Sequence, residues 1–231
     1  MLSNRDTGKP IDMPKLESPF LREETRDGYV CVPKINEEYR WVFTEQADAV
    51  EKLDGTNVSI VVKEHTLIGI YNRKNAINPW KKGNKRFIEG MLNTIERETI
   101  NLGGMEDGQY FGELIGPLVN GNPYKPSEHL WLPLSFLRSS YHYKFWDKLV
   151  PEFKGIGDSE IFDKVSNTFV GLWSLYKRKH FKDVEFAAPT KDTPFTGFAA
   201  EGIVFYNRST GRMCKLRRDM FQWFTGERHA Q

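Results

Sequence analysis

The stretch Ala49–Lys63 constrains the fold most strongly, because a lysine and a turn lie between two apolar runs. Asp54-Gly55 is a turn signal, since glycine tolerates a positive φ and aspartate hydrogen-bonds nearby backbone. The β-branched run after the turn predicts a strand. Lys52 is therefore expected at a strand end, where a rigid support often holds functional side chains. A lysine can act as a covalent nucleophile once its ammonium loses a proton, but an ordinary solvated hairpin fits the same pattern.

Length and composition exclude several classes of protein. The 231 residues suffice for one large domain or two small ones. The formal net charge is only +2, so any nucleic-acid binding must come from local clusters of basic residues. Two cysteines are too few for a disulfide framework, and the histidines lack zinc-site spacing. Without a signal peptide or an apolar run long enough to span a bilayer, we expect a soluble, cytoplasmic protein with no membrane contact.

The chain as a whole indicates an α+β fold with no internal repeat or long linker, so residues 1–231 are taken as one domain. Residues 1–28 contain three prolines among charged residues and are expected to form an irregular arm. Periodicity and turn signals predict strands at Tyr29–Val32, Tyr39–Phe43, His65–Arg73, Gln109–Pro117, Thr168–Tyr176, Glu201–Tyr206 and Arg212–Arg218. Helices are predicted at about Asn84–Ile100, Arg138–Leu149 and Asp158–Val165.

A basic loop follows the strand that should pair with the one after Lys52. Arg73 would end that second strand, on the same side of the sheet as Lys52. The loop then carries Lys74, Trp80, Lys81 and Lys82. A solvated charged surface explains these residues about as well as phosphate contact does. An exposed tryptophan among cations could stack on a base, which favours nucleic acid.

The last two predicted strands are joined by a short turn-rich link, which indicates a hairpin. Strand alternation puts Cys214 and Leu216 on one face, and Lys215 and Arg217 on the other. The two basic side chains therefore point the same way, as two groups holding one anion would need to.

Polar landmarks stand on the predicted strands in a characteristic order. They are Lys52 in Lys-x-Asp-Gly, the following Arg73, Glu113 in Gly-Glu-Leu, an aromatic strand with Trp173, Glu201 in Glu-Gly-Ile-Val-Phe, and the basic strand with Lys215 and Arg217. This ordered series resembles the covalent nucleotidyltransferases, the superfamily of polynucleotide ligases and mRNA capping enzymes. Within it, the stretches Glu51–Asn57, Tyr110–Pro117 and Gly211–Asp219 are most similar to ATP-dependent RNA ligases.

The resemblance implies an adenylation domain in which antiparallel sheets flank a nucleotide groove. The similarity covers about Val50 to Arg218, which leaves little room for an appended OB-fold. It also implies catalysis in which Lys52 attacks the α-phosphorus of ATP and Lys215 and Arg217 stabilise the phosphate charge. A partner protein that supplies the missing domain remains open.

Further site residues follow from the same resemblance. Arg73 would lie near the ribose and phosphates, Glu113 would hold the ribose hydroxyl, and Glu201 would bind a divalent metal, Mg²⁺ or Mn²⁺. Glu113 is expected as a second metal ligand, because carboxylate oxygens suit hard cations. Around the base, Trp173 would stack on one purine face, Val204 would pack on the other, and Glu51 would read the exocyclic amine.

The activity that the resemblance implies is sealing of RNA ends, a 5′-phosphate to a 3′-hydroxyl. Lys74, Trp80, Lys81, Lys82 and Arg218 would line the RNA path. A DNA ligase, a GTP-using capping transferase and a nucleotide- or RNA-end-binding module that does not seal are the alternatives.

Two positions depart from the family pattern. Arg217 stands where many relatives have lysine, and Arg218 could share its function. Ser174 follows Trp173 where some RNA ligases have aspartate.

Overall fold

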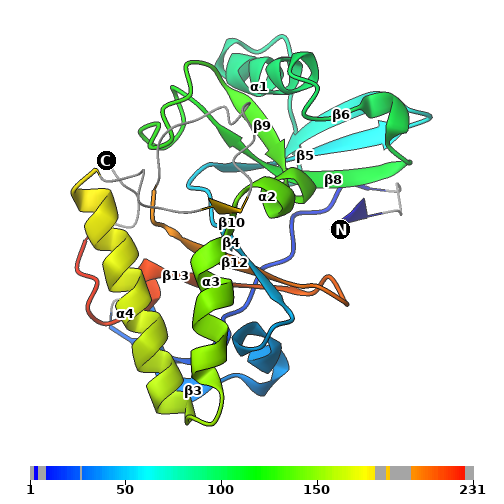
Figure 1. Cartoon of the computed structure of the whole chain (residues 1–231). Coiled ribbons are helices and arrows are strands. Elements are labelled where there is room, and N and C mark those ends of the chain that lie inside the picture. Colours follow the sequence, from blue (N-terminus) through cyan, green and yellow to red (C-terminus); the bar gives the residue numbers. More distant parts are fainter. Residues whose placement is uncertain (1–2, 5–8, 27, 180–185, 188–198, 227–231) are drawn as a thin grey trace.

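The computed structural model describes residues 3–4, 9–26, 28–179, 186–187 and 199–226 (Figure 1). Two antiparallel sheets form the framework of this part of the chain. The first has the order β1 (Ser3–Asn4), β8 (Gly108–Ile115), β5 (Thr56–Lys63), β6 (Thr66–Asn72), β7 (Asn75–Ala76), and β9 (Leu130–Pro133) also pairs with β8. The second has the order β11 (Phe186–Ala187), β10 (His142–Tyr143), β4 (Ala47–Glu51), β12 (Gly202–Asn207), β13 (Met213–Arg217). The expected mixture of helices and antiparallel sheets is confirmed.

The segment that contains Lys52 crosses from one sheet to the other. β4 belongs to the second sheet and β5 to the first, so the two strands do not pair with each other. The turn at Asp54-Gly55 is therefore a crossing between sheets and not the tip of a hairpin. β5 does pair with β6 as predicted, with Val58 opposite Asn72, which brings Arg73 close to the start of β5.

Each sheet is packed against its own helices. Helix α1 (Lys85–Glu96) presents Phe87 and Met91 to β-strand residues of the first sheet, including Ile60. Helix α4 (Asp158–Lys177) buries one stripe, made of Ile161, Val165, Phe169 and Leu172, in a hydrophobic cluster that also contains residues of the second sheet. Figure 1 shows α1 beside the first sheet and α4 beside the second, so the crossing segment lies between two separately supported layers.

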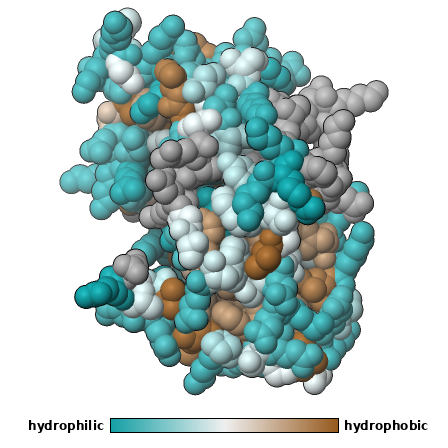
Figure 2. Space-filling view, turned by 90° about the vertical axis from the view of Figure 1, so that its left-hand side faces the viewer, coloured by the Kyte–Doolittle hydropathy of each residue, from teal (hydrophilic) through white to brown (hydrophobic). Residues whose placement is uncertain are grey.

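The other elements complete the second layer and the connections. They are β2 (Phe20–Thr25) paired with β3 (Gly28–Ile35), helices α2 (Leu134–Ser140) and α3 (Lys144–Leu149), and the 3₁₀ helices η1 (Glu37–Phe43), η2 (Lys82–Asn84), η3 (Leu102–Gly104), η4 (Val150–Phe153) and η6 (Arg218–Met220). On the face shown in Figure 2, hydrophobic side chains are scattered among hydrophilic ones. Among the described residues, no helix is both long enough and apolar enough to span a bilayer.

Three predicted elements were wrong. Tyr39–Phe43 is part of the 3₁₀ helix η1, and the helix expected at Arg138–Leu149 is split into α2 and α3 by the short strand β10. Thr168–Tyr176 is not a strand but the second half of α4. A short apolar run cannot distinguish a buried strand from a buried helix segment, and here the run continues a helix whose buried positions repeat every three to four residues.

The predicted irregular arm is partly regular, and it links the two sheets. Residues 9–19, which we call the strap, have no helix or strand, whereas β1 and the whole of β2 lie within the arm as well. At one end Ile11 exchanges two hydrogen bonds with the side chain of Gln109 on β8, at 2.9 and 2.8 Å. At the other end the backbone N–H of Lys215 on β13 donates to Glu17 O at 2.8 Å. Figure 1 shows this blue segment running from the first sheet to the second.

Candidate active site

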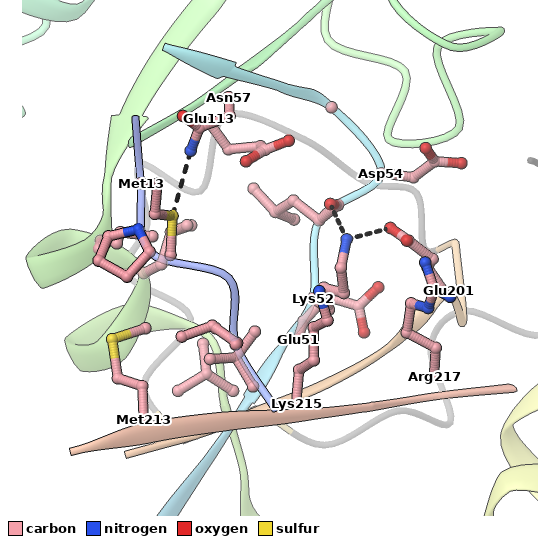
Figure 3. Close-up of a pocket in the computed structure, with 18 of the residues that line it drawn as sticks. Met13, Glu51, Lys52, Asp54, Asn57, Glu113, Glu201, Met213, Lys215 and Arg217 are labelled. Carbon is pink, nitrogen blue, oxygen red and sulfur yellow. Dashed lines mark hydrogen bonds and ion pairs between the residues drawn. The ribbon is translucent and has the colours of Figure 1, made fainter. Parts of the chain in front are cut away.

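A cavity of about 570 Å³ lies around Lys52, between the two sheets (Figure 3). This volume is within the range of small-molecule sites, roughly 300–1,000 Å³. Its lining comes from distant segments of the chain: residues 12–16 of the strap, residues 50–55 and Asn57, Arg73, Glu113, Leu134 and Leu137, Glu201, Val204 and Tyr206, and Met213, Lys215 and Arg217. Most of the residues predicted to form a nucleotide site are therefore brought together.

Lys52 is held by the strand that carries Glu201. Its backbone N–H donates to Gly202 O at 2.9 Å, which continues the pairing of β4 with β12 by one residue. Its Nζ donates to Glu201 Oε2 at 2.7 Å and lies 3.4 Å from Leu53 O, as the dashed lines in Figure 3 mark. These contacts fix the position of the Lys52 side chain beside Glu201.

Glu113 lies against the turn that follows Lys52, and only glycine fits there. A Cβ on Gly55 would lie 2.5 Å from Leu114 O and 2.6 Å from Glu113 Cγ. Burial raises the pKa of Glu113 to about 8, partly opposed by the charge of Lys52 and assisted by Glu201 and Asp54. The charges of Lys52, Glu201 and Asp54 therefore all act on the Glu113 carboxyl.

Glu51 is a buried carboxyl of the cavity, with 2% of its surface exposed. The hydroxyl of Tyr143 donates to Glu51 Oε2, and the Tyr124 hydroxyl lies 3.5 Å from Oε1. Burial raises the pKa of Glu51 to about 8, although the Tyr143 hydrogen bond lowers it. The expected contact of Glu51 with an exocyclic amine stays a prediction, and the structure adds the two tyrosines that hold the carboxyl.

Three cationic side chains line the same cavity. Arg73 directly follows β6, where its backbone has a φ of 55°. Lys215 and Arg217 lie on β13 opposite Val204 and Gly202, and both face the cavity as strand alternation predicted. Arg217 Nε pairs with Asp219 Oδ1 at 2.9 Å. The cavity can therefore accept an anion beside the lysine.

One wall of the cavity is apolar, and the sequence identified only part of it. Val204 was predicted, and it is joined by Tyr206 two residues further along the same strand and by Met213 on β13. Leu134 and Leu137 from α2 complete this wall. Strand alternation could have identified two of these residues, because it puts Tyr206 on the same face as Val204 and Met213 on the same face as Lys215. Nothing in the local sequence marks the two leucines as cavity residues.

Two predicted site residues lie elsewhere. Trp173 is on α4, stacked on Tyr176 with centroids 4.9 Å apart, and it does not line the cavity. Arg218 is 1% exposed, donates to Ala199 O at 2.8 Å, and lies over the Trp173 ring at 4.5 Å. The predictions of a tryptophan platform for the purine and of Arg218 on the RNA path were therefore wrong. Both residues instead stabilise the packing of α4 against the end of β13.

The basic loop after Arg73 is at the surface as expected. Lys74, Lys81 and Lys82 are exposed, and 91% of the Trp80 surface is exposed. Because Lys74 directly follows a cavity residue, the loop begins at the edge of the cavity. RNA contact by these four residues stays a prediction.

The carboxylates suit a divalent metal only with help from other ligands. In the part of the chain that the structure describes, no three Asp, Glu, His or Cys side chains are arranged to hold a metal ion. Glu113 and Glu201 nevertheless lie close enough for Glu201 to raise the pKa of Glu113. Mg²⁺ is usually held by one or two carboxylates together with phosphates and waters, so this pair fits such an ion.

The chain is similar in structure to solved structures of Naegleria gruberi RNA ligase. The apo form of a mutant has 14% sequence identity and a TM-score of 0.43, and the match covers 95% of this chain and 61% of that one. The ligase with pyrophosphate has 13% identity and a TM-score of 0.43, covering 92% and 59%. A mutant with ATP and Mn has 13% identity and a TM-score of 0.40, covering 95% and 62%. The chain thus spans less than two thirds of these ligase chains. No protein-family model and no curated protein matches its sequence.

Proposed function

We propose that the chain is an ATP-dependent RNA ligase that carries AMP on Lys52. The observation that supports this most is the convergence on one cavity of a lysine, two carboxylates and three cations from separate strands or strand ends. These are the residues that stand in ligase-like order along the sequence. A solvated hairpin would not enclose Lys52 in this way.

In the first step, Lys52 Nζ attacks the α-phosphorus of ATP. An N–P bond forms, the bond from the α-phosphorus to the β-phosphate oxygen breaks, and pyrophosphate leaves. The ammonium must first give its proton to water, which breaks the 2.7 Å ion pair with Glu201. Arg73, Lys215 and Arg217 would stabilise charge on the phosphate in the transition state.

Two further transfers complete the reaction. An oxygen of an RNA 5′-phosphate attacks the α-phosphorus, the N–P bond breaks, and AMP passes to the RNA as a 5′–5′ diphosphate. An RNA 3′-hydroxyl then attacks the 5′-phosphate, loses its proton, and releases AMP. The same cations would hold the AMP phosphate in all three steps.

Glu113 and Glu201 would hold the divalent metal, Mg²⁺ or Mn²⁺. When bound, the ion would supply charge neutralisation of the phosphates and carboxylates. The adenine would pack on the apolar wall made by Val204, Leu134 and Met213, and Glu113 would also reach the ribose hydroxyl. Glu51, held by Tyr143, would contact the exocyclic amine. In this proposal aliphatic side chains, and not Trp173, pack against the purine.

The test is covalent labelling. The protein is incubated with α-³²P-ATP and Mg²⁺ or Mn²⁺, and label is followed on a denaturing gel. Wild type is expected to retain label and Lys52→Ala to retain none, whereas Lys63→Ala at the far end of β5 labels normally. Equal label on wild type and Lys52→Ala would refute the proposal, as would no label on wild type.

The alternatives are separated with the same preparation. Preferential label from α-³²P-GTP would indicate a capping transferase, and sealing of nicked DNA but not RNA would indicate a DNA ligase. Label without joining of any RNA end would indicate a module that does not seal by itself, or one that needs a partner protein for the missing surface.

The RNA is proposed to leave the cavity along the loop that carries Lys74, Trp80, Lys81 and Lys82. Substituting Lys81 and Lys82 by alanine should weaken binding of a 5′-phosphorylated oligonucleotide, and lower the log–log salt slope by about 0.7 for each lost contact. Trp80→Ala should weaken binding at every salt concentration, by about 1–3 kcal/mol if one base stacks. Fluorescence anisotropy at several salt concentrations measures both effects. Lys154→Ala, remote in sequence and paired with Glu45, is the control; an equal change there would contradict the proposed path.

A further inference from the structure

We infer that residues 117–126, which we call the clamp loop, position Lys52 for attack, and that Asn120 and Tyr124 are the positioning residues. The inference rests on the proposed function, because it concerns the same lysine. The clamp loop joins β8 to β9 and is built from successive turns. Asn122 N–H donates to Val119 O at 2.8 Å and Lys125 N–H to Asn122 O at 3.1 Å. These backbone hydrogen bonds within the loop restrict its conformation, so that its side chains are held in fixed positions.

Asn120 holds the turn that follows Lys52. Its Nδ2 donates to Asp54 Oδ1 at 2.8 Å and to Gly55 O at 2.9 Å. One amide group therefore fixes both a side chain and a backbone carbonyl of the turn. Asp54 is 2% exposed, and Figure 3 shows its carboxyl directed away from Lys52, which is consistent with a structural partner on the far side.

Tyr124 ties together the two sides of the lysine. Its hydroxyl accepts the backbone N–H of Asp54 at 2.7 Å and lies 3.5 Å from Oε1 of Glu51. Glu51 precedes Lys52 and Asp54 follows it by two residues, so a single hydroxyl contacts the chain before and after the nucleophile. The Tyr124 ring is 1% exposed and packs in the cluster that contains Val50 and Leu53.

The clamp loop holds a stretch of backbone that no strand pairing supports. The residues after Lys52 leave the second sheet before β5 enters the first, so no strand pairing holds the backbone of Asp54-Gly55. The clamp loop supplies hydrogen bonds in place of that ladder. The attacking atom must be placed closely, since a displacement of about 1 Å can cost roughly 100-fold in rate.

Neither positioning residue lines the cavity. Both reach Lys52 only through its neighbours, Asp54, Gly55 and Glu51. Loss of either residue should therefore slow the attack much more than it weakens binding of ATP. A group that contacted the nucleotide would instead change the affinity for ATP.

The experiment compares Tyr124→Phe and Asn120→Ala with a control outside the site, Thr94→Val. Thr94 is fully buried, its hydroxyl lies 2.7 Å from both Gly90 O and Trp131 O, and it accepts the backbone N–H of Trp131 at 2.9 Å, so this variant also loses buried hydrogen bonds. Single-turnover formation of lysyl-AMP is measured across ATP concentrations. We expect the maximal rate to fall between about 10- and 100-fold in both clamp variants, with the half-saturating ATP concentration within about threefold of wild type. Thr94→Val should keep the wild-type rate.

A second measurement does not depend on activity. Amide hydrogen exchange at Asp54 should accelerate at least about tenfold in Tyr124→Phe, because its hydrogen-bond acceptor is gone, and should be unchanged in Thr94→Val. Three results would each refute the inference that the clamp loop positions Lys52: unchanged exchange at Asp54, unchanged rates in both clamp variants, or an equal rate loss in Thr94→Val. If wild type forms no lysyl-AMP, the proposed function fails, and the exchange result alone decides whether the clamp holds the turn.

Discussion

Glu51 shows at the scale of one residue how the cavity departs from an ordinary surface. Burial raises the pKa of its carboxyl from 4.5 to about 8. Between these values the folded state binds a proton that the unfolded state has lost. The free energy of unfolding therefore falls as pH rises through this window, since stability decreases with pH where the folded state holds more protons.

Substituting Glu51 by glutamine should remove its share of this dependence. The decline in the free energy of unfolding from about pH 5 to pH 8 should become shallower by up to about 1 kcal/mol per pH unit. The glutamine oxygen can still accept the Tyr143 hydroxyl, so packing is retained. Urea unfolding at several pH values measures the slope. Glu160→Gln, at an exposed position on α4, should leave it unchanged; an unaltered slope in Glu51→Gln would contradict the expected protonation.

Helix α4 shows how the type of secondary structure decides which side chains of a segment are buried and what they contact. The run Thr168–Tyr176 is apolar enough to resemble a buried strand, but Phe169 is 2% exposed and the next residue, Val170, is 42% exposed. Trp173 follows Phe169 by one helical turn and lies on the same side, where it meets Tyr176, Phe224 and Arg218. Because the segment is helical, Trp173 packs against these neighbouring side chains.

Replacing Trp173 by alanine should lower stability without changing nucleotide binding. The ring is only partly buried, so we expect a loss of about 2 kcal/mol, below the range for fully buried tryptophans. The affinity of the folded variant for ATP should stay within about twofold of wild type. Urea unfolding and calorimetric ATP titration measure the two quantities. Leu134→Ala, on the cavity wall, should instead weaken ATP binding. If the folded Trp173→Ala protein bound ATP less tightly, Trp173 would contribute to the nucleotide site after all.

The whole molecule is organised by the meeting of two sheets, and three segments shape the junction between them. The crossing after Lys52 carries the nucleophile, the clamp loop holds that crossing, and the strap forms the opposite wall through residues 12–16. Within the strap, Met13 is held by the Asn57 amide, which donates to its Sδ at 3.2 Å. The cavity therefore depends on the strap being attached at both ends.

Detaching one end of the strap should weaken ATP binding. Gln109→Met keeps the side-chain length but removes the two bonds to Ile11 and a third, at 2.8 Å, to Ser59 Oγ. We expect ATP affinity to fall about tenfold, close to 1.4 kcal/mol, because residues 12–16 are no longer held against the cavity. Calorimetric titration measures the affinity, and Thr94→Val again controls for a buried hydrogen-bond loss elsewhere. Unchanged affinity in Gln109→Met would show that the strap does not shape the site.

Local patterns determined much of this protein. The pairing of β5 with β6, the final hairpin, and the shared face of Lys215 and Arg217 all follow from turn chemistry and two-residue periodicity. Both depend only on neighbours in sequence. Most of the polar residues of the site were instead recognised from their order along the sequence, which resembles the motif series of the covalent nucleotidyltransferases.

The tertiary structure decided the rest, because it depends on which distant surfaces meet. Sequence spacing could not show that β4 and β5 enter different sheets, that α2 supplies Leu134 to the cavity, or that the strap closes it. Nor could it show that Trp173 and Arg218 pack together away from the cavity. An apolar or cationic side chain has the same local pattern whether it faces a ligand or a neighbouring element, and only long-range packing distinguishes the two.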